Sequence, residues 1–338
     1  MKNFEEKSER NHYIDLLRGL CILGIILNHT CFYSGDSYVP KEFANLVLLL
    51  DVPALFLISG MTYQLIKRDM ILNSIVKFSL CFTVISLVLN FMYRELSWKS
   101  LLQPLFLGGV QVPEFFVCVQ NSYWFVPVYV IVLVAGETLL QKLRPLYPVF
   151  LFFCIAAYFY DYFIGFSLME VKIFGWDASY VLFYLGMFLF GYFVQDKVVI
   201  SQKRKIWALS ILCTSVLIYS ALYLKFKGVN AVALELASKF PPKLPYVVLS
   251  FISAACFIFF YKAERSCKFL EHIGKNAIFY YACQGMGASI LYLVAPKVVL
   301  PMFFKLVLMF GINLLLVVIF AEVLKFVFDL VGDVYRRW

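Results

Sequence analysis

Charged residues are scarce in this chain. Lys, Arg, Asp and Glu make up 15 % of the 338 residues and hydrophobic residues 62 %, and the mean hydropathy is +0.83. No single water-soluble core could hide so much apolar surface, so the composition excludes an ordinary soluble domain. Long uncharged runs recur from end to end, which predicts a polytopic helical membrane protein.

The chain also lacks the marks of several other classes. Its nine cysteines include no CxxC pair and lie mostly in apolar runs, so we expect neither a metal nor disulfide bonds. We find no low-complexity tract, no internal repeat and no separate soluble domain, and we expect residues 1–338 to form one integral membrane domain. The polar stretch 1–11 runs into a span without a small-residue cleavage pattern, so we expect the first helix not to be cleaved off as a signal peptide.

Ten apolar runs are each about long enough to cross a bilayer. The runs are residues 16–33, 43–66, 71–93, 123–140, 147–165, 178–195, 206–224, 244–261, 277–295 and 301–328. They predict an all-α bundle of about ten transmembrane helices. The two longest connections, 94–122 and 225–243, then lie outside, and the apolar pieces of the first suggest re-entrant or interfacial segments.

The distribution of Lys and Arg gives the orientation. With the N-terminus in the cytosol, eighteen of them fall in inner segments and ten in outer segments, so the positive-inside rule predicts that both termini are cytoplasmic. The net charge of +9 is thereby assigned to membrane topology, and no nucleic-acid partner is expected.

The first span holds two ionisable residues on one face. Arg18 lies at its inner edge and His29 well inside it; eleven helical positions put the two within about 20° of each other around the axis and about 16 Å apart along it. Ionisable groups inside a span are expensive and usually serve a path, a relay or a site, and a neutral imidazole exchanges protons near pH 7.

Four segments together resemble one family. YIDLLRGLCILGIILNH supplies Asp15, then Leu-Arg-Gly with Arg18, then His29 after ten intervening residues. VPALFLISGM follows in the second span, SYWFVPVYV begins at Ser122, and IGKNAIFYYACQ begins at Ile273. In this order they resemble the signature segments of the acyltransferase 3 family, which are integral membrane acyltransferases.

The resemblance implies an acyl-coenzyme A donor from the cytosol, acetyl-CoA by default, and an acceptor hydroxyl on an extracytoplasmic glycan or glycolipid sugar. His29 is then the general base, with an acyl-histidine intermediate as the rival mechanism. The expected location is a bacterial inner membrane, with lipid, acyl-CoA and carbohydrate as partners. The residues assigned to the donor are Arg18, Asp15, Lys67, Arg68 and Ser59, and those assigned to the acceptor are Trp124 and Tyr123.

The chain departs from the family pattern at two places. Gln284 stands where the family often has a second histidine, so no role of that histidine is carried over. Where members often have Arg-x-x-Arg after the second span, this chain has only Lys67 and Arg68, followed by Lys77 inside the third span.

Depth within the bundle suggests a partner for His29. Asp51 lies about eight residues, or roughly 12 Å, from the outer end of the second span, close to the level of His29. We therefore predict that Asp51 orients His29 and stabilises its imidazolium, as carboxylates do in hydrolase triads.

Structural explanations remain open for the same residues. Arg18 could snorkel to the headgroups or pair with Asp15 one turn away. Ser59 with Gly60 could be small residues at a helix contact, and Trp124 with Tyr123 an aromatic belt. Lys77 and a Glu322–Lys325 pair are read as structural. A transporter or flippase also buries charges along a path, and a scaffold without chemistry would leave the Arg, His and Asp unexplained.

Overall fold

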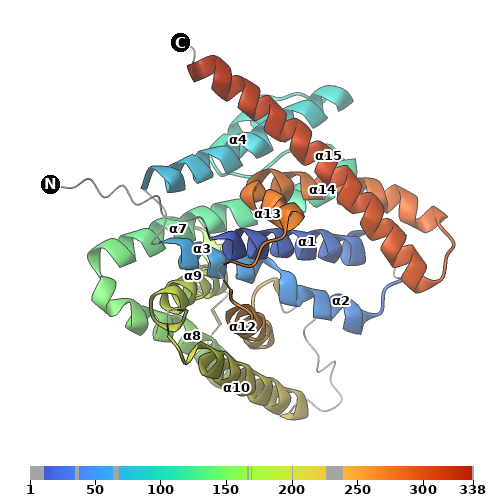
Figure 1. Ribbon diagram of the computed structural model, residues 1–338. Helices are drawn as coiled ribbons and strands as arrows, with labels where there is room; N and C mark the ends of the chain where they lie inside the picture. Colours follow the sequence, from blue (N-terminus) through green and yellow to red (C-terminus); the bar gives the residue numbers. More distant parts are fainter. Residues whose placement is uncertain are drawn as a thin grey trace.

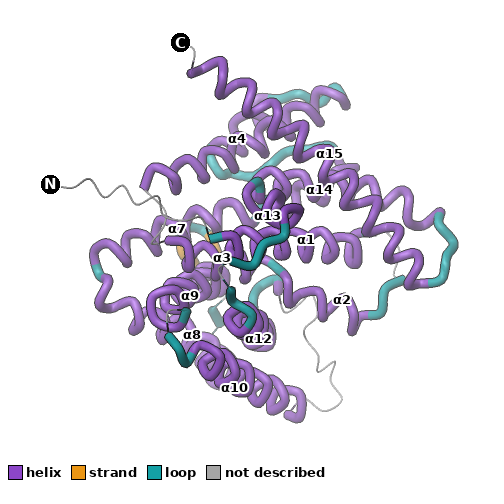
Figure 2. The backbone as a smooth tube through the Cα atoms, in the orientation of Figure 1, coloured by secondary structure: helices purple, strands orange, loops and turns teal. Residues whose placement is uncertain are grey.

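The protein is almost entirely helical (Figures 1 and 2). The computed structural model describes residues 11–34, 38–63, 68–165, 167–168, 170–199, 201–225, 239–262 and 264–336. Its α-helices are α1 (His12–Tyr33), α2 (Lys41–Val47), α3 (Val52–Thr62), α4 (Arg68–Tyr93), α5 (Trp98–Leu105), α6 (Val117–Ser122), α7 (Phe125–Lys142), α8 (Tyr147–Ile164), α9 (Ala178–Phe193), α10 (Arg204–Lys225), α12 (Leu244–Phe259), α13 (Lys268–Lys275), α14 (Ala277–Val294) and α15 (Met302–Arg336). Short 3-10 or π turns are Leu48–Leu50, Glu114–Phe116, Arg144–Leu146, Val194–Val198 and Ala295–Lys297, and the strands β1 (Lys172–Ile173) and β2 (Trp176–Asp177) form a small hairpin.

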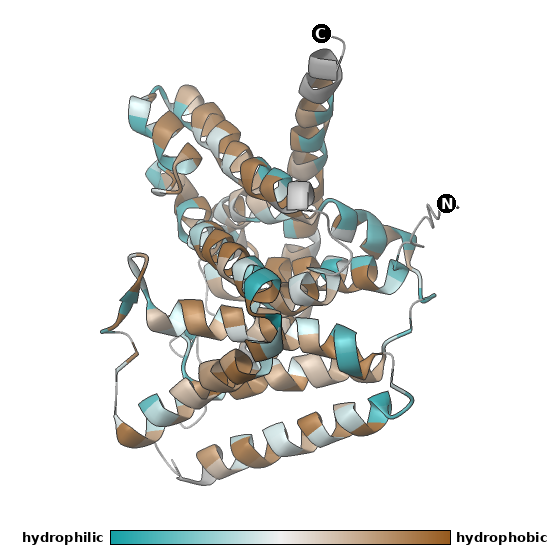
Figure 3. Cartoon of the chain, turned by 90° about the vertical axis from the view of Figure 1, so that its left-hand side faces the viewer, coloured by the Kyte–Doolittle hydropathy of each residue, from teal (hydrophilic) through white to brown (hydrophobic). Residues whose placement is uncertain are grey.

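The predicted all-α membrane bundle is confirmed. Eight helices of the described chain are long and apolar enough to span a bilayer, and Leu48–Thr62 and Leu244–Phe259 are shorter apolar helices. The two short helices account for the difference from the ten spans predicted. The helices are largely hydrophobic along their length (Figure 3), and only 17 % of the apolar window of α10 is buried, against 72 % in α9. A helix with an apolar outer face fits contact with lipid.

Helix α1 lies in the middle of the bundle (Figure 1), where it packs against α13, α14 and α15. Asn11 begins it as an N-cap, its side chain accepting from the amide of Ile14. Gly19 of α1 crosses Gly274 of α13 so closely that a Cβ on Gly19 would meet the Leu270 carbonyl oxygen at 2.0 Å. α1 begins and α15 ends on the same side of the bundle, at the left of Figure 1.

The second predicted span, residues 43–66, is not one helix. The chain runs through α2 and the turn Leu48–Leu50, becomes extended at Asp51 (φ −127°, ψ −173°), and starts α3 at Val52. Pro53 in the first turn of α3 favours a helix start there, because its missing N–H would be unpaired in any case. The hydroxyl of Ser253 on α12 donates to the Leu49 carbonyl, so part of the backbone freed by the break is bonded to a neighbouring helix.

The first long outer connection is more ordered than a loop. It holds α5 and α6, and the apolar helical stretch Glu114–Lys142 joins α6 to α7. Most of the second connection, residues 226–238, lies outside the described residues.

Candidate active site

Two cavities lie along the Arg18–His29 face of α1. The large cavity, about 410 Å³, is lined by Arg18 and Ser59 among others. The small cavity, about 20 Å³, is lined by His29 and Asp51 among others. Tyr281 of α14 lines both cavities, and its hydroxyl donates to the Ser122 carbonyl at 3.0 Å. Tyr281 therefore stands between the two cavities.

The large cavity has a cationic lining. Arg18 of α1, Lys77 of α4 and Lys275 at the end of α13 all border it, and apolar rings such as Phe78 and Phe125 line the rest. Positive charges grouped in a partly apolar cleft attract an anionic ligand with an apolar part.

Contacts within the bundle orient Arg18. Its Nη2 donates to the Thr62 hydroxyl of α3 at 3.0 Å, and its Nη1 lies 3.5 Å from the Asp15 carboxylate. The side chain is 27 % exposed and borders the large cavity. Asp15 is buried and paired with Arg18, which is the structural explanation considered for it.

The helix α13 holds Lys275 in place. Glu271 on this helix contacts Lys275 at 3.4 Å and His12, the first residue of α1, at 2.8 Å. Hydrogen bonds from Ser266 and His12 lower the pKa of Glu271 to about 2. Since Glu271 is thus a carboxylate at neutral pH, its negative charge attracts both the ammonium of Lys275 and the His12 side chain at the start of α1.

His29 reaches the small cavity with one nitrogen unsatisfied. Its Nδ1 is buried without a hydrogen bond to any described residue, and its ring packs at 5.0 Å against Tyr33. The Nδ2 of Asn28 and both amide atoms of Gln284 are likewise buried and unpaired among the described residues, and all three residues line the small cavity. Buried polar atoms without partners are rare and mark a place where water or a ligand binds.

Asp51 lines the same cavity but does not hydrogen-bond to His29 in the described structure. Its Oδ2 accepts from the hydroxyl of Tyr246 at 2.9 Å and from the Nζ of Lys239 at 2.5 Å, and its Oδ1 is buried and unpaired. Counting residues along the spans therefore placed Asp51 in the same cavity as His29. It did not predict the partners of the carboxylate, which are Tyr246 and Lys239.

The remaining predicted residues divide into three groups. Trp124 lines the small cavity and packs edge-on at 5.3 Å against Phe240. The Tyr123 hydroxyl instead donates to the Pro104 carbonyl of α5 at 3.1 Å, and this ring lines neither the large nor the small cavity. Lys67 and the side chain of Arg68 lie outside the described residues.

Sequence reasoning missed Lys239, Lys275 and Tyr281 as cavity residues, and it treated Lys77 as structural. Lys275 and Tyr281 belong to the IGKNAIFYYACQ segment, so the signal was present but was used only for the resemblance. Lys239 comes at the end of the sequence segment 225–243, which shows no hydrophobic periodicity to indicate which way a side chain points.

Comparison with known families identifies the family of this chain. A family model described as an acyltransferase domain matches residues 11–322, nearly the whole chain. The chain belongs to the acyltransferase 3 family. No curated protein and no solved structure matches it. The protein is thus a membrane acyltransferase.

Proposed function

We propose that this protein moves an acyl group, acetyl by default, from cytosolic acyl-coenzyme A to a hydroxyl of an extracytoplasmic glycan or glycolipid sugar, in a bacterial inner membrane. The observation that carries the proposal is the pair of cavities along α1. The cationic one borders Arg18, the other holds His29, and Tyr281 borders both.

The large cavity suits the donor. Coenzyme A joins an anionic phosphate-bearing head to a slender arm that ends in the thioester. Arg18, Lys77 and Lys275 offer positive charge to the head, and the planar guanidinium of Arg18 matches a phosphate in two-point contact. The arm then runs along α1 towards Tyr281, beyond which lies His29.

The small cavity suits the reacting groups rather than a whole sugar. A volume of about 20 Å³ admits little more than one hydroxyl or one water, while Trp124 and Phe240 at its border offer aromatic faces to a sugar ring. The base is His29: it takes the proton of the acceptor hydroxyl as the oxygen attacks the thioester carbonyl. The C–S bond then breaks, and the thiolate of coenzyme A receives that proton from the imidazolium. In the rival mechanism the imidazole attacks first and carries the acyl group.

A transport assay separates this function from a flippase. We expect vesicles containing the purified protein to release free coenzyme A from labelled acetyl-CoA and to move the label to a glycan acceptor or to water. Movement of a labelled glycan precursor across the vesicle membrane, with no loss of thioester, would instead identify a transporter. Protein-free vesicles and vesicles with heat-inactivated protein are the controls.

A further inference from the structure

Lys239 is a buried lysine that neither the fold nor the family match explains. Its side chain is 7 % exposed and that of Asp51 0 %, although lysine is among the residues least often buried. Removing two charges from water is expensive, and only close pairing and further hydrogen bonds offset that cost. Here the ion pair is at 2.5 Å, and the Tyr246 hydroxyl makes a second contact to the same carboxylate oxygen.

Asp51 also breaks a local rule. It occupies the N-cap position of α3, where an aspartate normally accepts from the first free amides of the helix. Its side chain makes no such bond and points to Lys239 and Tyr246 instead. A residue that gives up its local partner for a distant charge is expected at functional sites.

We propose that Lys239 and Tyr246 are positioning residues for the proposed base. They fix Asp51 through Oδ2, so that the free Oδ1 faces the small cavity and takes the Nδ1–H of His29 through a single bridging water. The cavity has room for about one water and is lined by the polar partners that such a water needs. The tautomer with hydrogen on Nδ1 leaves Nε2 to take the proton of the acceptor hydroxyl. The negative charge of Asp51 stabilises the imidazolium that then forms, and the positive charge of Lys239 partly offsets this stabilisation. This role rests on the proposed function.

The titratable groups near His29 define what a charge change can do. They are Tyr33 on α1, Asp51 before α3, Tyr281 on α14 and Lys239, with Cys118 of α6 beside Tyr33 and Tyr246 bonded to Asp51. Asp51 and Lys239 form an ion pair and carry charges of opposite sign. Removing the cation should therefore move the titration of the base to higher pH, and removing the anion should move it to lower pH.

The test is the acid limb of the pH dependence of kcat/KM for acyl transfer. Lys239→Met removes a cation, favours the imidazolium, and is expected to move the limb up by about one pH unit. Asp51→Asn removes the anion, moves the limb down, and lowers kcat about 10²-fold. The double variant removes both buried charges and leaves neither unpaired, so its limb should lie close to that of the wild type. Lys239→Arg retains the positive charge, so its limb should also stay at the wild-type position.

Lys243→Met is the matched control, because Lys243 belongs to the same outer segment but is exposed; its limb should not move. Limbs that stay in place, or that move the same way in both single variants, overturn the positioning role while the transfer activity of the wild type upholds the proposed function. Absence of transfer in the wild type overturns both. If one single variant does not fold, the other decides the matter, because each has its own predicted direction: up for Lys239→Met and down for Asp51→Asn.

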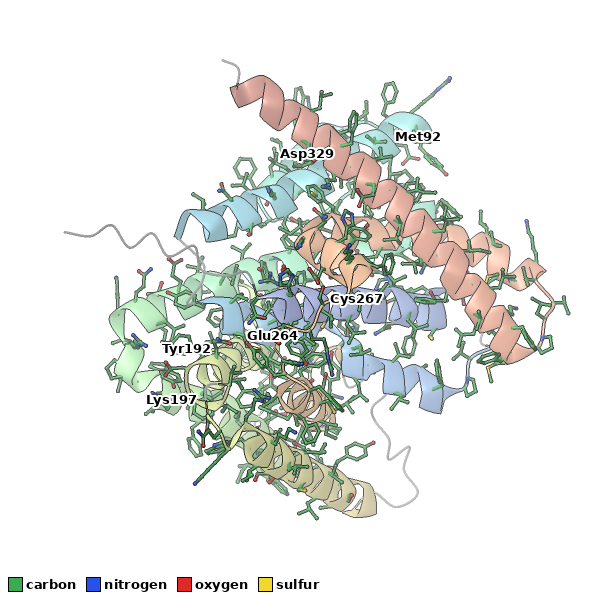
Figure 4. The ribbon with its side chains drawn as sticks, in the orientation of Figure 1. Met92, Tyr192, Lys197, Glu264, Cys267 and Asp329 are labelled. Atoms are coloured by element: carbon green, nitrogen blue, oxygen red, sulfur yellow. The ribbon has the colours of Figure 1, made fainter. Side chains whose placement is uncertain are left out.

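A separate observation concerns a third cavity, of about 300 Å³, between α4, α14 and α15. Lys77, Lys275 and Lys325 line it, against the single carboxylate of Asp329, which Figure 4 labels on α15. Phe279 and Phe328 also line it, with ring centroids 5.4 Å apart. The third cavity shares Lys77 and Lys275 with the large cavity.

We infer that the third cavity binds the phosphoadenosine end of the proposed donor. Three ammonium groups suit the dianionic 3′-phosphate of coenzyme A, and an aromatic pair suits a purine, whose face stacks on such rings. An anionic lipid headgroup shares the phosphate but has no base for the aromatic pair.

Acetyl-CoA and acetyl-dephospho-CoA, which lacks only the 3′-phosphate, test this site. We expect the wild type to prefer acetyl-CoA by about 10-fold in KM and Lys325→Gln to lose most of that preference with kcat retained. The exposed Lys262→Gln is the control and should keep it. An unchanged preference in Lys325→Gln overturns the assignment, and if the variant instead alters the dependence on phosphatidylglycerol, the ligand is a lipid. Transfer from neither donor would refute the proposed function itself.

Discussion

Replacing His29 by alanine is expected to lower the rate of acyl transfer by about 10²–10⁴-fold, the usual contribution of a positioned general base. The physical reason is that His29 is the one described residue lining the small cavity with an imidazole, the side chain best suited to take and return a proton near neutral pH. Asp51 is already bonded to Lys239 and Tyr246. Binding of coenzyme A should survive, because the cationic lining of the large cavity lies on the other side of Tyr281.

The measurement pairs transfer rates with equilibrium binding of coenzyme A to the same detergent-purified variants. His272→Ala is the matched control, because His272 is bonded to Glu322 at 2.6 Å on the bundle surface and should leave the rate unchanged. A His29→Ala protein that transfers within about threefold of wild type would exclude both the base and the acyl-histidine role. Loss of binding together with rate would show that the substitution disturbed the fold.

Gly60→Ala is expected to destabilise the bundle by about 1–3 kcal/mol or more, the usual consequence of overpacking. Gly60 of α3 crosses Gly191 of α9, and a Cβ on Gly60 would meet the Phe188 carbonyl oxygen at 1.8 Å. On the facing helix, the Cβ that Gly191→Ala adds would meet the Leu57 carbonyl oxygen at 1.9 Å. Both obstacles are backbone, so the helices must separate, and van der Waals contact along this packed interface is lost.

The readout is the fraction of monodisperse protein remaining after heating in detergent. Gly311→Ala on α15 is the control, because no heavy atom lies within 4 Å of the Cβ it would add and alanine is the better helix former. It should be neutral or slightly stabilising. Gly60→Ala with wild-type heat resistance would mean that α3 and α9 are free to move apart, contrary to their close crossing. Such a result would leave the small-residue explanation of Gly60 without support.

Helix geometry explains what could be predicted of the site. Arg18 and His29 lie on one continuous helix, so their spacing alone put them on one face, and each lines a cavity on that face. Asp51 was assigned to the depth of His29 by counting residues, and it lines the cavity of His29. Periodicity carries such information wherever the chain stays regular.

Irregular backbone explains what could not be predicted. The break at Asp51 turns one apolar run into α2, a short turn and α3, and hydropathy does not register a bend within an apolar run. Lys239 follows a long outer connection, so its burial against Asp51 depends on a contact between residues far apart in the chain. Tyr123 faces α5 rather than the site, although its neighbour Trp124 lines the small cavity.

The sequence by itself determined the membrane character, the helical class, the family and the stripe from Arg18 to His29, because these follow from composition, local motifs and the period of one helix. Only the tertiary structure decided which charges face that stripe. Lys77, Lys275 and Lys239 come from separate segments, and the partner of a buried charge is chosen by desolvation and three-dimensional packing, not by neighbours along the chain.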